Sequence, residues 1–296
     1  MTGTPDILCI GSVLWDVIGR TASQMRLGAD VPGRITRLPG GVAMNIAMTL
    51  RRFGMRPALL SAIGRDAEGD ELVAQSARMG LVTGHLYRSD DLPTDVYMAI
   101  EGAGGLVAAI ADAHSLEQAG AKILAPLADG RLGSAQTPWA GLVALDGNLT
   151  PDLLAEIAQS PLFARSDLRV APASPGKAAR LLALLGHPSA TLYVNLEEAG
   201  ILCNRVFDSA AAAAAGLCAR GAHRVLVTDG GRAASEACGA RRLTLIPPQV
   251  QVARVTGAGD TFMAAHVASE AQGLDPAAAL ARAVEAAATF VSGETP

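Results

Sequence analysis

Short apolar runs alternate with longer segments of helical periodicity along most of the chain. Runs with the length of a buried strand lie at 7–10, 57–63, 143–145, 168–171, 192–194, 224–228 and 243–246. Between them, apolar side chains recur every three or four residues and predict helices at 42–53, 70–79, 151–159, 176–185, 209–215, 261–272 and 276–290. This alternation is typical of an α/β fold in which helices cover both faces of a mostly parallel sheet.

Two segments, 12–38 and 93–111, fit this alternation poorly. The first contains a stretch at 34–38 in which apolar and polar residues alternate as in an exposed strand. The second contains two apolar runs around the glycine-rich turn 101–105, which predicts a β-hairpin. We expect the two segments to form one small β-sheet that covers a site as a lid. No internal repeat or linker interrupts the sequence, so residues 1–296 are expected to form a single domain.

The composition excludes several functional classes. Hydrophobic residues make up 50% and charged residues 18% of the sequence, which is typical of a globular protein. The net charge is -4 and the sequence has no basic tract, which argues against nucleic acid as a partner. No apolar run reaches membrane-spanning length, and no basic region precedes the first apolar run as in a signal peptide. The four cysteines form no C-x-x-C pair, so we expect buried free thiols in a cytoplasmic protein.

The strongest candidate for chemistry is the glycine turn that ends at Asp260. Gly257 and Gly259 flank Ala258 directly before a predicted helix, and glycine lets the backbone approach a ligand closely. Unpaired N–H groups and the helix dipole make such a helix start suitable for phosphate. The Asp260 carboxylate would repel a phosphate, which makes sense if it takes a proton from a hydroxyl that attacks the phosphate. The alternative at this turn alone is an ordinary aspartate cap.

Other glycine-rich and polar groups follow predicted strands, where a parallel sheet binds its ligands. Their order and spacing resemble the ribokinase family, the PfkB-type carbohydrate kinases, across residues 6–292. The matching stretches are GGVAMNIA at 40–47, IGRDAEG at 63–69, NLEE at 195–198 and VTGAGDTF at 255–262. The resemblance implies a ribokinase-like three-layer sandwich with a small β-sheet lid. It also implies an ATP- and Mg²⁺-dependent kinase for a sugar or nucleoside hydroxyl, in a family that often uses potassium near the anion hole.

The resemblance assigns the phosphoryl-transfer roles residue by residue. Asp260 matches the base that accepts the proton of the attacking hydroxyl. The anion hole, whose N–H groups stabilise charge on the phosphoryl group, matches Gly257, Ala258 and Gly259. Asn195 and Glu198 match an N-x-x-E motif that organises Mg²⁺ and phosphate through water. Without the resemblance, Glu198 would be taken for a solvated charge on a helix face, and the neighbouring Glu197 is its natural control.

The sugar-binding roles fall on the first fifty residues. Asp16 matches the aspartate that holds two sugar hydroxyls, although an aspartate at this position could also cap a turn. Gly40 and Gly41 allow the backbone to approach a sugar, and Asn45 offers both a donor and an acceptor to its hydroxyls.

The nucleotide-binding roles fall on Thr228 and Gly230, which match a T-x-G pattern, and on Thr256 in the glycine turn. Two positions depart from the family pattern. Ala233 stands where relatives usually have a second glycine, which leaves the local loop geometry open. Ala171 stands where many relatives have an aspartate, which leaves Mg²⁺ binding and specificity open. Lys177 follows shortly after, either as a compensating group or as a solvated lysine.

Within the family, the stretches at 32–47, 109–118 and 143–149 most resemble pseudouridine kinases, which implies phosphorylation of the 5′-hydroxyl of pseudouridine. His114, after the lid hairpin, either faces this substrate or lies at the surface. Kinases for ribose, fructose, keto-deoxy sugar acids or adenosine remain alternatives, as does a catalytically weak nucleotide-binding regulator. A dinucleotide-dependent dehydrogenase is disfavoured because no G-x-G-x-x-G follows the first strand. Relatives often pair through the lid sheet, so we expect a homodimer.

Overall fold

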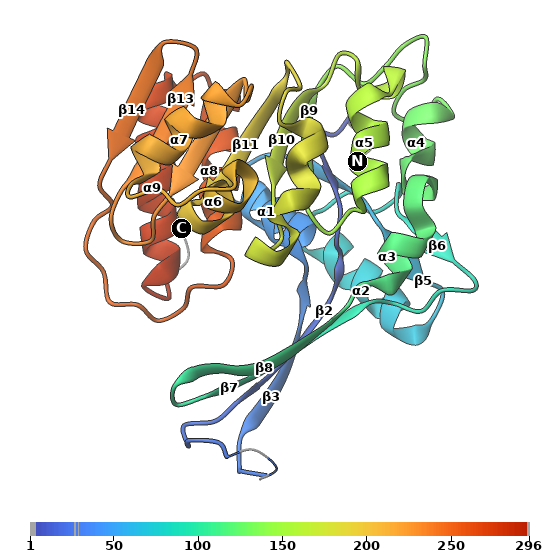
Figure 1. Ribbon diagram of the computed structural model, residues 1–296. Helices are drawn as coiled ribbons and strands as arrows, with labels where there is room; N and C mark the ends of the chain where they lie inside the picture. Colours follow the sequence, from blue (N-terminus) through green and yellow to red (C-terminus); the bar gives the residue numbers. More distant parts are fainter. Residues whose placement is uncertain (1–3, 27, 29, 295–296) are drawn as a thin grey trace.

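The computed structural model describes residues 4–26, 28 and 30–294, so residues 1–3 and 295–296 of the predicted domain, and positions 27 and 29 of the predicted lid segment, lie outside the described residues. Within the described part, eight strands form a central sheet in the order β14-β13-β12-β11-β10-β9-β1-β4 (Figure 1). The strands are β1 (Ile7–Ile10), β4 (Pro57–Leu60), β9 (Leu142–Asp146), β10 (Asp167–Ala171), β11 (Ala190–Asn195), β12 (Arg224–Thr228), β13 (Ala234–Cys238) and β14 (Arg241–Leu245). Strands β12 to β4 pair in parallel, and β13 and β14 complete one edge antiparallel.

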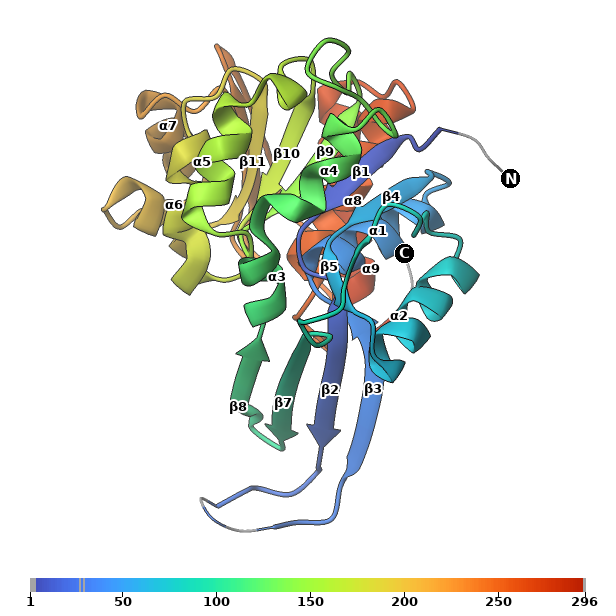
Figure 2. The same ribbon diagram turned by 90° about the vertical axis from the view of Figure 1, so that its right-hand side faces the viewer.

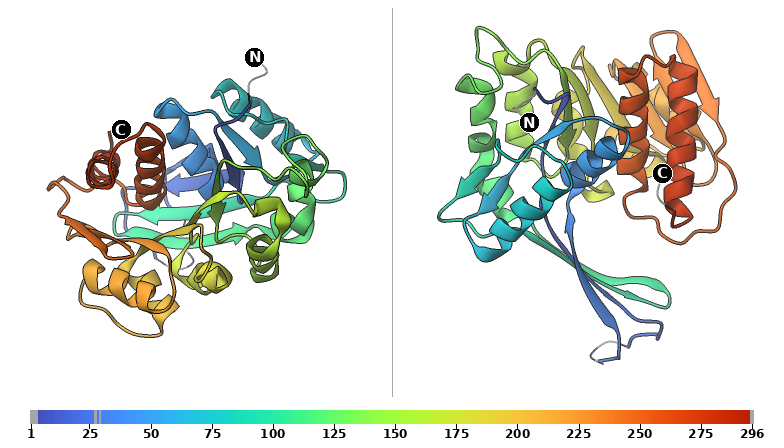
Figure 3. Two further views of the ribbon diagram at one scale, coloured as in Figure 1. Left: turned by 90° about the horizontal axis from the view of Figure 1, so that it is seen from above. Right: turned by 180° about the vertical axis from the view of Figure 1, so that it is seen from behind.

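Helices cover both faces of this sheet, which confirms the predicted three-layer architecture (Figure 3). One face carries α3 (His114–Ala119), η1 (Gly120–Leu124), α4 (Ala125–Ala128), α5 (Pro151–Gln159), η2 (Pro161–Phe163), η3 (Pro175–Leu184), α6 (Leu196–Cys203) and α7 (Ala210–Ala219). The other carries α1 (Val42–Arg52), α2 (Ala67–Arg78), α8 (Ala258–Ala271) and α9 (Pro276–Val291). Side chains alternate between the two cores along β1, with Leu8 in the first and Cys9 in the second. A strand buried on both faces therefore needs a continuous apolar run.

A separate four-stranded sheet extends from the body of the protein (Figure 2). Its order is β3-β2-β7-β8, formed by β2 (Leu14–Arg20), β3 (Arg34–Gly40), β7 (Val96–Gly102) and β8 (Gly105–Asp112). The two segments that fit the main pattern poorly therefore do form one small sheet. Since β2 follows β1 after a few residues, this small sheet starts at the carboxyl edge of the central sheet. Its action as a lid stays a prediction.

Three local expectations were wrong, and one expected helix is of another type. The run 57–63 is divided into β4 and β5 (Ala62–Gly64), and β5 pairs with β6 (Tyr87–Ser89). Helix α2 begins at Ala67, before the predicted start, because Asp66 caps it by accepting from Gly69 N at 2.7 Å. Segment η3 is a 3₁₀ helix instead of an α-helix. Strand β13 was missed because its buried Glu236 hides the apolar pattern, and this carboxylate pairs with Arg224 and Arg241.

The structure bears on two expectations from composition, the state of the cysteines and the lack of a membrane-spanning segment. All four cysteines lie in the described part as free thiols, but only Cys9 is buried, because Cys203, Cys218 and Cys238 lie at or near the ends of their elements. Among the residues that the structure describes, no helix is both long and apolar enough to cross a membrane.

Candidate active site

The predicted site residues gather where the parallel strands of the central sheet end. Asn195 and Thr228 are paired neighbours at the ends of β11 and β12. Asp146 and Ala171 are paired neighbours at the ends of β9 and β10. The starts of α1 and α8 supply further site residues, because α1 follows β3 directly and α8 packs against α1. Residues more than two hundred positions apart in the sequence thereby meet at one edge.

Asp260 lies in the first turn of α8 and is held by a residue of α1. Its Oδ2 accepts a hydrogen bond of 3.0 Å from Asn45 Nδ2. Burial raises the pKa of the Asp260 carboxyl to about 7, the Asn45 hydrogen bond lowers it, and the charges of nearby carboxylates raise it again. Those carboxylates belong to Asp146, Asp16 and Glu198. Asp260 is therefore an acid–base group poised near neutral pH, in contact with Asn45 and within reach of the charges of Asp16 and Glu198.

The glycine turn shapes the N-terminus of α8. Gly257 has a φ of 91°, a left-handed conformation that favours glycine, and it stands at the N-cap position without a side-chain cap. The N–H of Ala258 donates to Val255 O at 3.0 Å, whereas those of Gly257 and Gly259 have no partner among the described residues. A Cβ at Gly259 would meet no atom within 4 Å, so protein packing does not explain this glycine. Two N–H groups therefore point from an open helix start, as an anion site requires.

The four predicted sugar-binding residues lie on β2, at the end of β3 and in the first turns of α1. Asp16 lies on β2, and a Cβ at Gly40 on the paired strand β3 would come within 2.1 Å of its Oδ2. Gly41 has a φ of 95° and begins α1, whose first turn brings Asn45 toward Asp260. Burial raises the pKa of the Asp16 carboxyl to about 6. The glycines thus leave room for a partly buried acceptor beside the predicted base.

Asn195 and Glu198 form a reciprocal capping box at the start of α6. Asn195 N donates to Glu198 Oε2 at 2.8 Å, and Glu198 N donates to Asn195 Oδ1 at 2.9 Å. Glu198 is only 7% exposed, so the alternative of a solvated charge is wrong, whereas Glu197 beside it is exposed. Burial raises the pKa of the Glu198 carboxyl to about 7.

This geometry fits Mg²⁺ at Glu198 better than at Asn195. Magnesium takes oxygen ligands, and the Asn195 oxygen already accepts from Glu198 N. Glu198 has a second carboxylate oxygen to offer, and its buried charge would gain from a cation. Among the described residues, no group of three or more His, Cys, Asp or Glu is arranged to hold a metal by itself.

The predicted nucleotide-binding residues extend this edge. Thr228 ends β12, and Gly230 follows it with a left-handed φ of 55° and open space around its Cβ position. Thr256 is exposed before the start of α8. Ala233 is partly buried just before β13, and buried Ala171 ends β10, where its carbonyl accepts from the Gly147 N–H. The roles of these residues stay predictions.

One part of the site was missed from the sequence. Asp146 is fully buried, and its Oδ2 accepts from Ser12 N at 2.7 Å, Ser12 Oγ at 2.9 Å and Ala43 N at 3.0 Å. Its Oδ1 accepts from Asn148 N at 2.6 Å. This carboxylate therefore ties the loop that leads to Asp16 to the helix that carries Asn45. The only sequence signal was a polar Asp-Gly-Asn directly after an apolar run.

Two side chains that the sequence left open now have positions. Lys177 is partly buried and donates to Asn148 Oδ1 at 2.5 Å, so the alternative of a solvated lysine is wrong. His114 is exposed and pairs with Asp112 at 2.7 Å, which is the surface position that the sequence allowed.

Comparison with known proteins agrees with this geometry. The family model described as pfkB family carbohydrate kinase matches residues 4–295. The chain is 28% identical over 268 residues to a pseudouridine kinase of Escherichia coli K12, which covers 87% of this chain and 81% of that protein. It is 31% identical over 274 residues to the uncharacterized sugar kinase YeiI of the same organism, with 89% and 72% covered. The structure of Thermotoga maritima ribokinase has a TM-score of 0.78 and 20% identity, covering 97% of this chain and 93% of that one, which shows a ribokinase-like fold.

Proposed function

Since this chain belongs to the PfkB family of carbohydrate kinases, we propose that it transfers the γ-phosphate of ATP to the ribose 5′-hydroxyl of pseudouridine. The observation that carries the catalytic part is the Asp260 carboxylate, which Asn45 holds at the open start of α8. The similarity to a pseudouridine kinase supports the substrate. A different sugar is the second candidate, supported by the similarity to the sugar kinase YeiI.

Asp260 would act as the general base. With a pKa of about 7, the carboxyl is substantially ionised at neutral pH and can still hold the proton of the attacking hydroxyl. The γ-phosphate would lie against the N–H groups of Gly257 and Gly259, which stabilise its developing charge. Mg²⁺ bound with ATP would neutralise phosphate oxygens, and Glu198 would orient its water ligands. Thr228, Gly230 and Thr256 would hold the nucleotide.

Asp16 would select a ribose diol. Its carboxylate occupies the space that a side chain at position 40 would fill. A carboxylate can accept hydrogen bonds from two adjacent hydroxyls. A substrate without the 2′-hydroxyl would leave a partly buried charged acceptor unpaired, which costs roughly 1.5–3 kcal/mol. We expect 2′-deoxy analogues to lose tenfold or more in kcat/KM.

The small sheet would act as a lid and as a dimer interface. Its strands expose apolar side chains at Ile35, Leu38, Leu106 and Ile110, between 53% and 77% exposed, which is typical of a surface with a partner. A second copy of this chain is the proposed partner. Sedimentation equilibrium should give a dimer for the wild type and a monomer for an Ile35→Lys, Ile110→Lys double variant, and a monomeric wild type would refute this interface.

A phosphorylation screen tests the substrate. ATP is supplied with pseudouridine, uridine, ribose, fructose, adenosine and a keto-deoxy sugar acid, and the Asp260→Asn variant, purified in the same way, subtracts contaminating kinases. We expect the largest kcat/KM for pseudouridine. Much faster turnover of ribose or a keto sugar acid would keep the kinase but refute the nucleoside, whereas no turnover of any sugar would refute both.

A further inference from the structure

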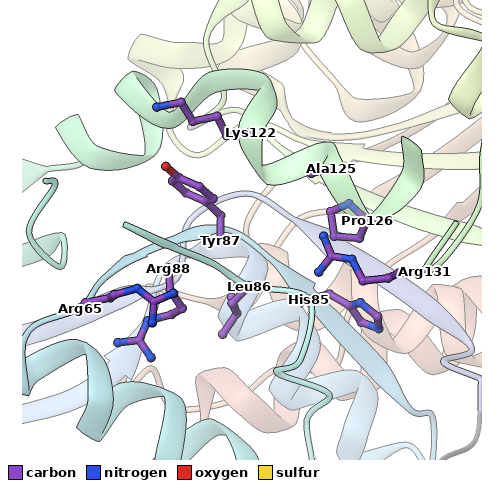
Figure 4. A pocket seen from close by; sticks show the side chains of 9 residues that line it. All are labelled: Arg65, His85, Leu86, Tyr87, Arg88, Lys122, Ala125, Pro126 and Arg131. Carbon is purple, nitrogen blue, oxygen red and sulfur yellow. The ribbon is translucent and has the colours of Figure 1, made fainter. Parts of the chain in front are cut away.

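A cavity lined by residues outside the candidate active site lies on the α3–α4 side of the protein (Figure 4). Its volume is about 280 Å³, close to the lower end of small-molecule sites at roughly 300 Å³. It lies between the β5–β6 region on one side and the η1–α4 segment on the other. The lining residues are Arg65, His85, Leu86, Tyr87, Arg88, Lys122, Ala125, Pro126 and Arg131.

Cationic side chains dominate the lining, which contains no Asp or Glu. Figure 4 shows Arg131 beside His85 at one end and Arg65 with Arg88 at the other, with Lys122 above the ring of Tyr87.

The carboxylate partners of these arginines lie outside the lining. The pairs are Arg65–Asp90 at 3.0 Å, Arg88–Asp70 at 2.7 Å and Arg131–Asp129 at 2.6 Å. Lys122 lies over the Tyr87 ring, and its charge and that of Asp91 act on each other. The formal charges of the lining residues are therefore all positive, and their carboxylate partners do not line the cavity, which favours an anion inside.

Two buried nitrogen atoms of the lining also need a partner. Arg88 Nε and His85 Nδ1 make no hydrogen bond within the described residues. Buried polar atoms are nearly always paired in folded proteins. An oxyanion at the His85 end would accept from Nδ1 of the tautomer that carries its proton there, and a polar group of the same ligand at the other end would accept from Arg88 Nε. The wall of Leu86, Tyr87 and Pro126 is apolar and suits the carbon skeleton of a small ligand.

We propose that this cavity binds a small phosphomonoester or inorganic phosphate, separately from the catalytic site. The phosphate would lie at the end lined by Arg131 and His85, where arginine offers a planar fork of donors, and the positive charge of Lys122 above Tyr87 would add to the attraction. A sugar-sized remainder would lie against Tyr87 and Pro126. Inorganic phosphate and a sugar phosphate would make the same contacts with the cationic side chains. Only the sugar phosphate would gain binding energy from contact with the apolar wall.

Titration calorimetry on the full-length protein tests the site. Ribose 5-phosphate, inorganic phosphate and ribose are titrated with a saturating unreactive ATP analogue, which occupies the catalytic phosphate site. The variants are Lys122→Ala and Arg131→Ala, both at exposed positions, and the matched control is Arg165→Ala, an exposed arginine outside the cavity. We expect the cavity variants to weaken phosphate binding at least tenfold and the control to leave it unchanged.

NMR of the histidine rings gives a second readout. The ring resonance of His85 is assigned by its loss in the His85→Gln variant. Phosphate should shift it while the resonance of exposed His223 stays in place. Stronger binding of ribose 5-phosphate than of inorganic phosphate would assign the site to a phosphomonoester, and equal binding would assign it to phosphate alone. Equal binding by the cavity variants and the control, or no binding by the wild type at millimolar concentration, would overturn the proposal.

Discussion

Replacing Asn45 by leucine should raise the pKa of the catalytic carboxyl. The Asn45 amide donates to Asp260 Oδ2 at 3.0 Å and so favours the ionised form. Burial, followed by the charges of neighbouring carboxylates, favours the protonated form and keeps the pKa of Asp260 at about 7. Leucine has nearly the shape of asparagine but donates no hydrogen bond, and it keeps water from replacing the lost donor.

The expected size of the effect follows from the strength of this hydrogen bond. A hydrogen bond to a charged group is worth about 1.5–3 kcal/mol. One pKa unit corresponds to about 1.4 kcal/mol. Losing the Asn45 donor should therefore raise the pKa of Asp260 by about one to two units, so that the carboxyl is mostly protonated at pH 7 and turnover falls at that pH.

Carbon NMR of aspartate-labelled protein measures this pKa without any substrate. The Asp260 carboxyl resonance is assigned by its loss in Asp260→Asn and followed against pH in the wild type and in Asn45→Leu. We expect a wild-type midpoint near pH 7 and a higher midpoint in the variant. A wild-type midpoint near 4, or equal midpoints in two folded proteins, would refute the electrostatic reasoning.

Three further outcomes are expected. Because folding raises the pKa of the Asp260 carboxyl from 3.8 to about 7, this group costs stability progressively as pH rises between these two values, so Asp260→Asn should raise Tm more at pH 8 than at pH 5; an equal effect at both values would contradict this. Glu198→Ala should raise the Mg²⁺ concentration for half-maximal rate, and Glu197→Ala should not; equal behaviour would make the motif match accidental. Gly40→Ala should lower kcat/KM for the sugar at least tenfold, because its Cβ would displace the carboxylate on β2, whereas Gly231→Ala, with open space around it, serves as the control whose equal loss would count against this role.

Most of the fold could be predicted from the sequence because strands that are buried on both faces of the sheet are apolar along most of their length. Strand β1 is a continuous apolar run, and the three central residues of β12 are apolar between Arg224 and Thr228. Strand β13 was not predicted because it contains the charged residue Glu236, which is buried. A carboxylate can be buried only when it has partners, and its partner Arg224 lies on another strand. The start of α2 was placed too late because the helix begins at the cap residue Asp66. The Oδ2 of Asp66 also accepts from Thr94 N, which lies far along the chain.

The candidate site was predictable only where a motif was continuous. The turn around Gly257 and the pair Asn195 and Glu198 are local patterns, and the structure brings them to one edge of the sheet. Asp146 was missed as a site residue because its partner Ser12 is 134 positions away, and such a contact exists only after β1 and β9 pair. The effect of neighbouring carboxylates on the pKa of Asp260 likewise depends on their distances in the folded protein, which the spacing of these residues along the sequence does not give.

The most direct test of the account is the turnover of the Asp260→Asn variant with the best substrate of the screen. Asparagine keeps the shape of the side chain but accepts no proton at this position. We expect kcat to fall by about 10²-fold or more, in the range typical of general-base removal, with ATP affinity nearly unchanged. Near-normal turnover by a folded Asp260→Asn protein would contradict the assignment of Asp260 as the base.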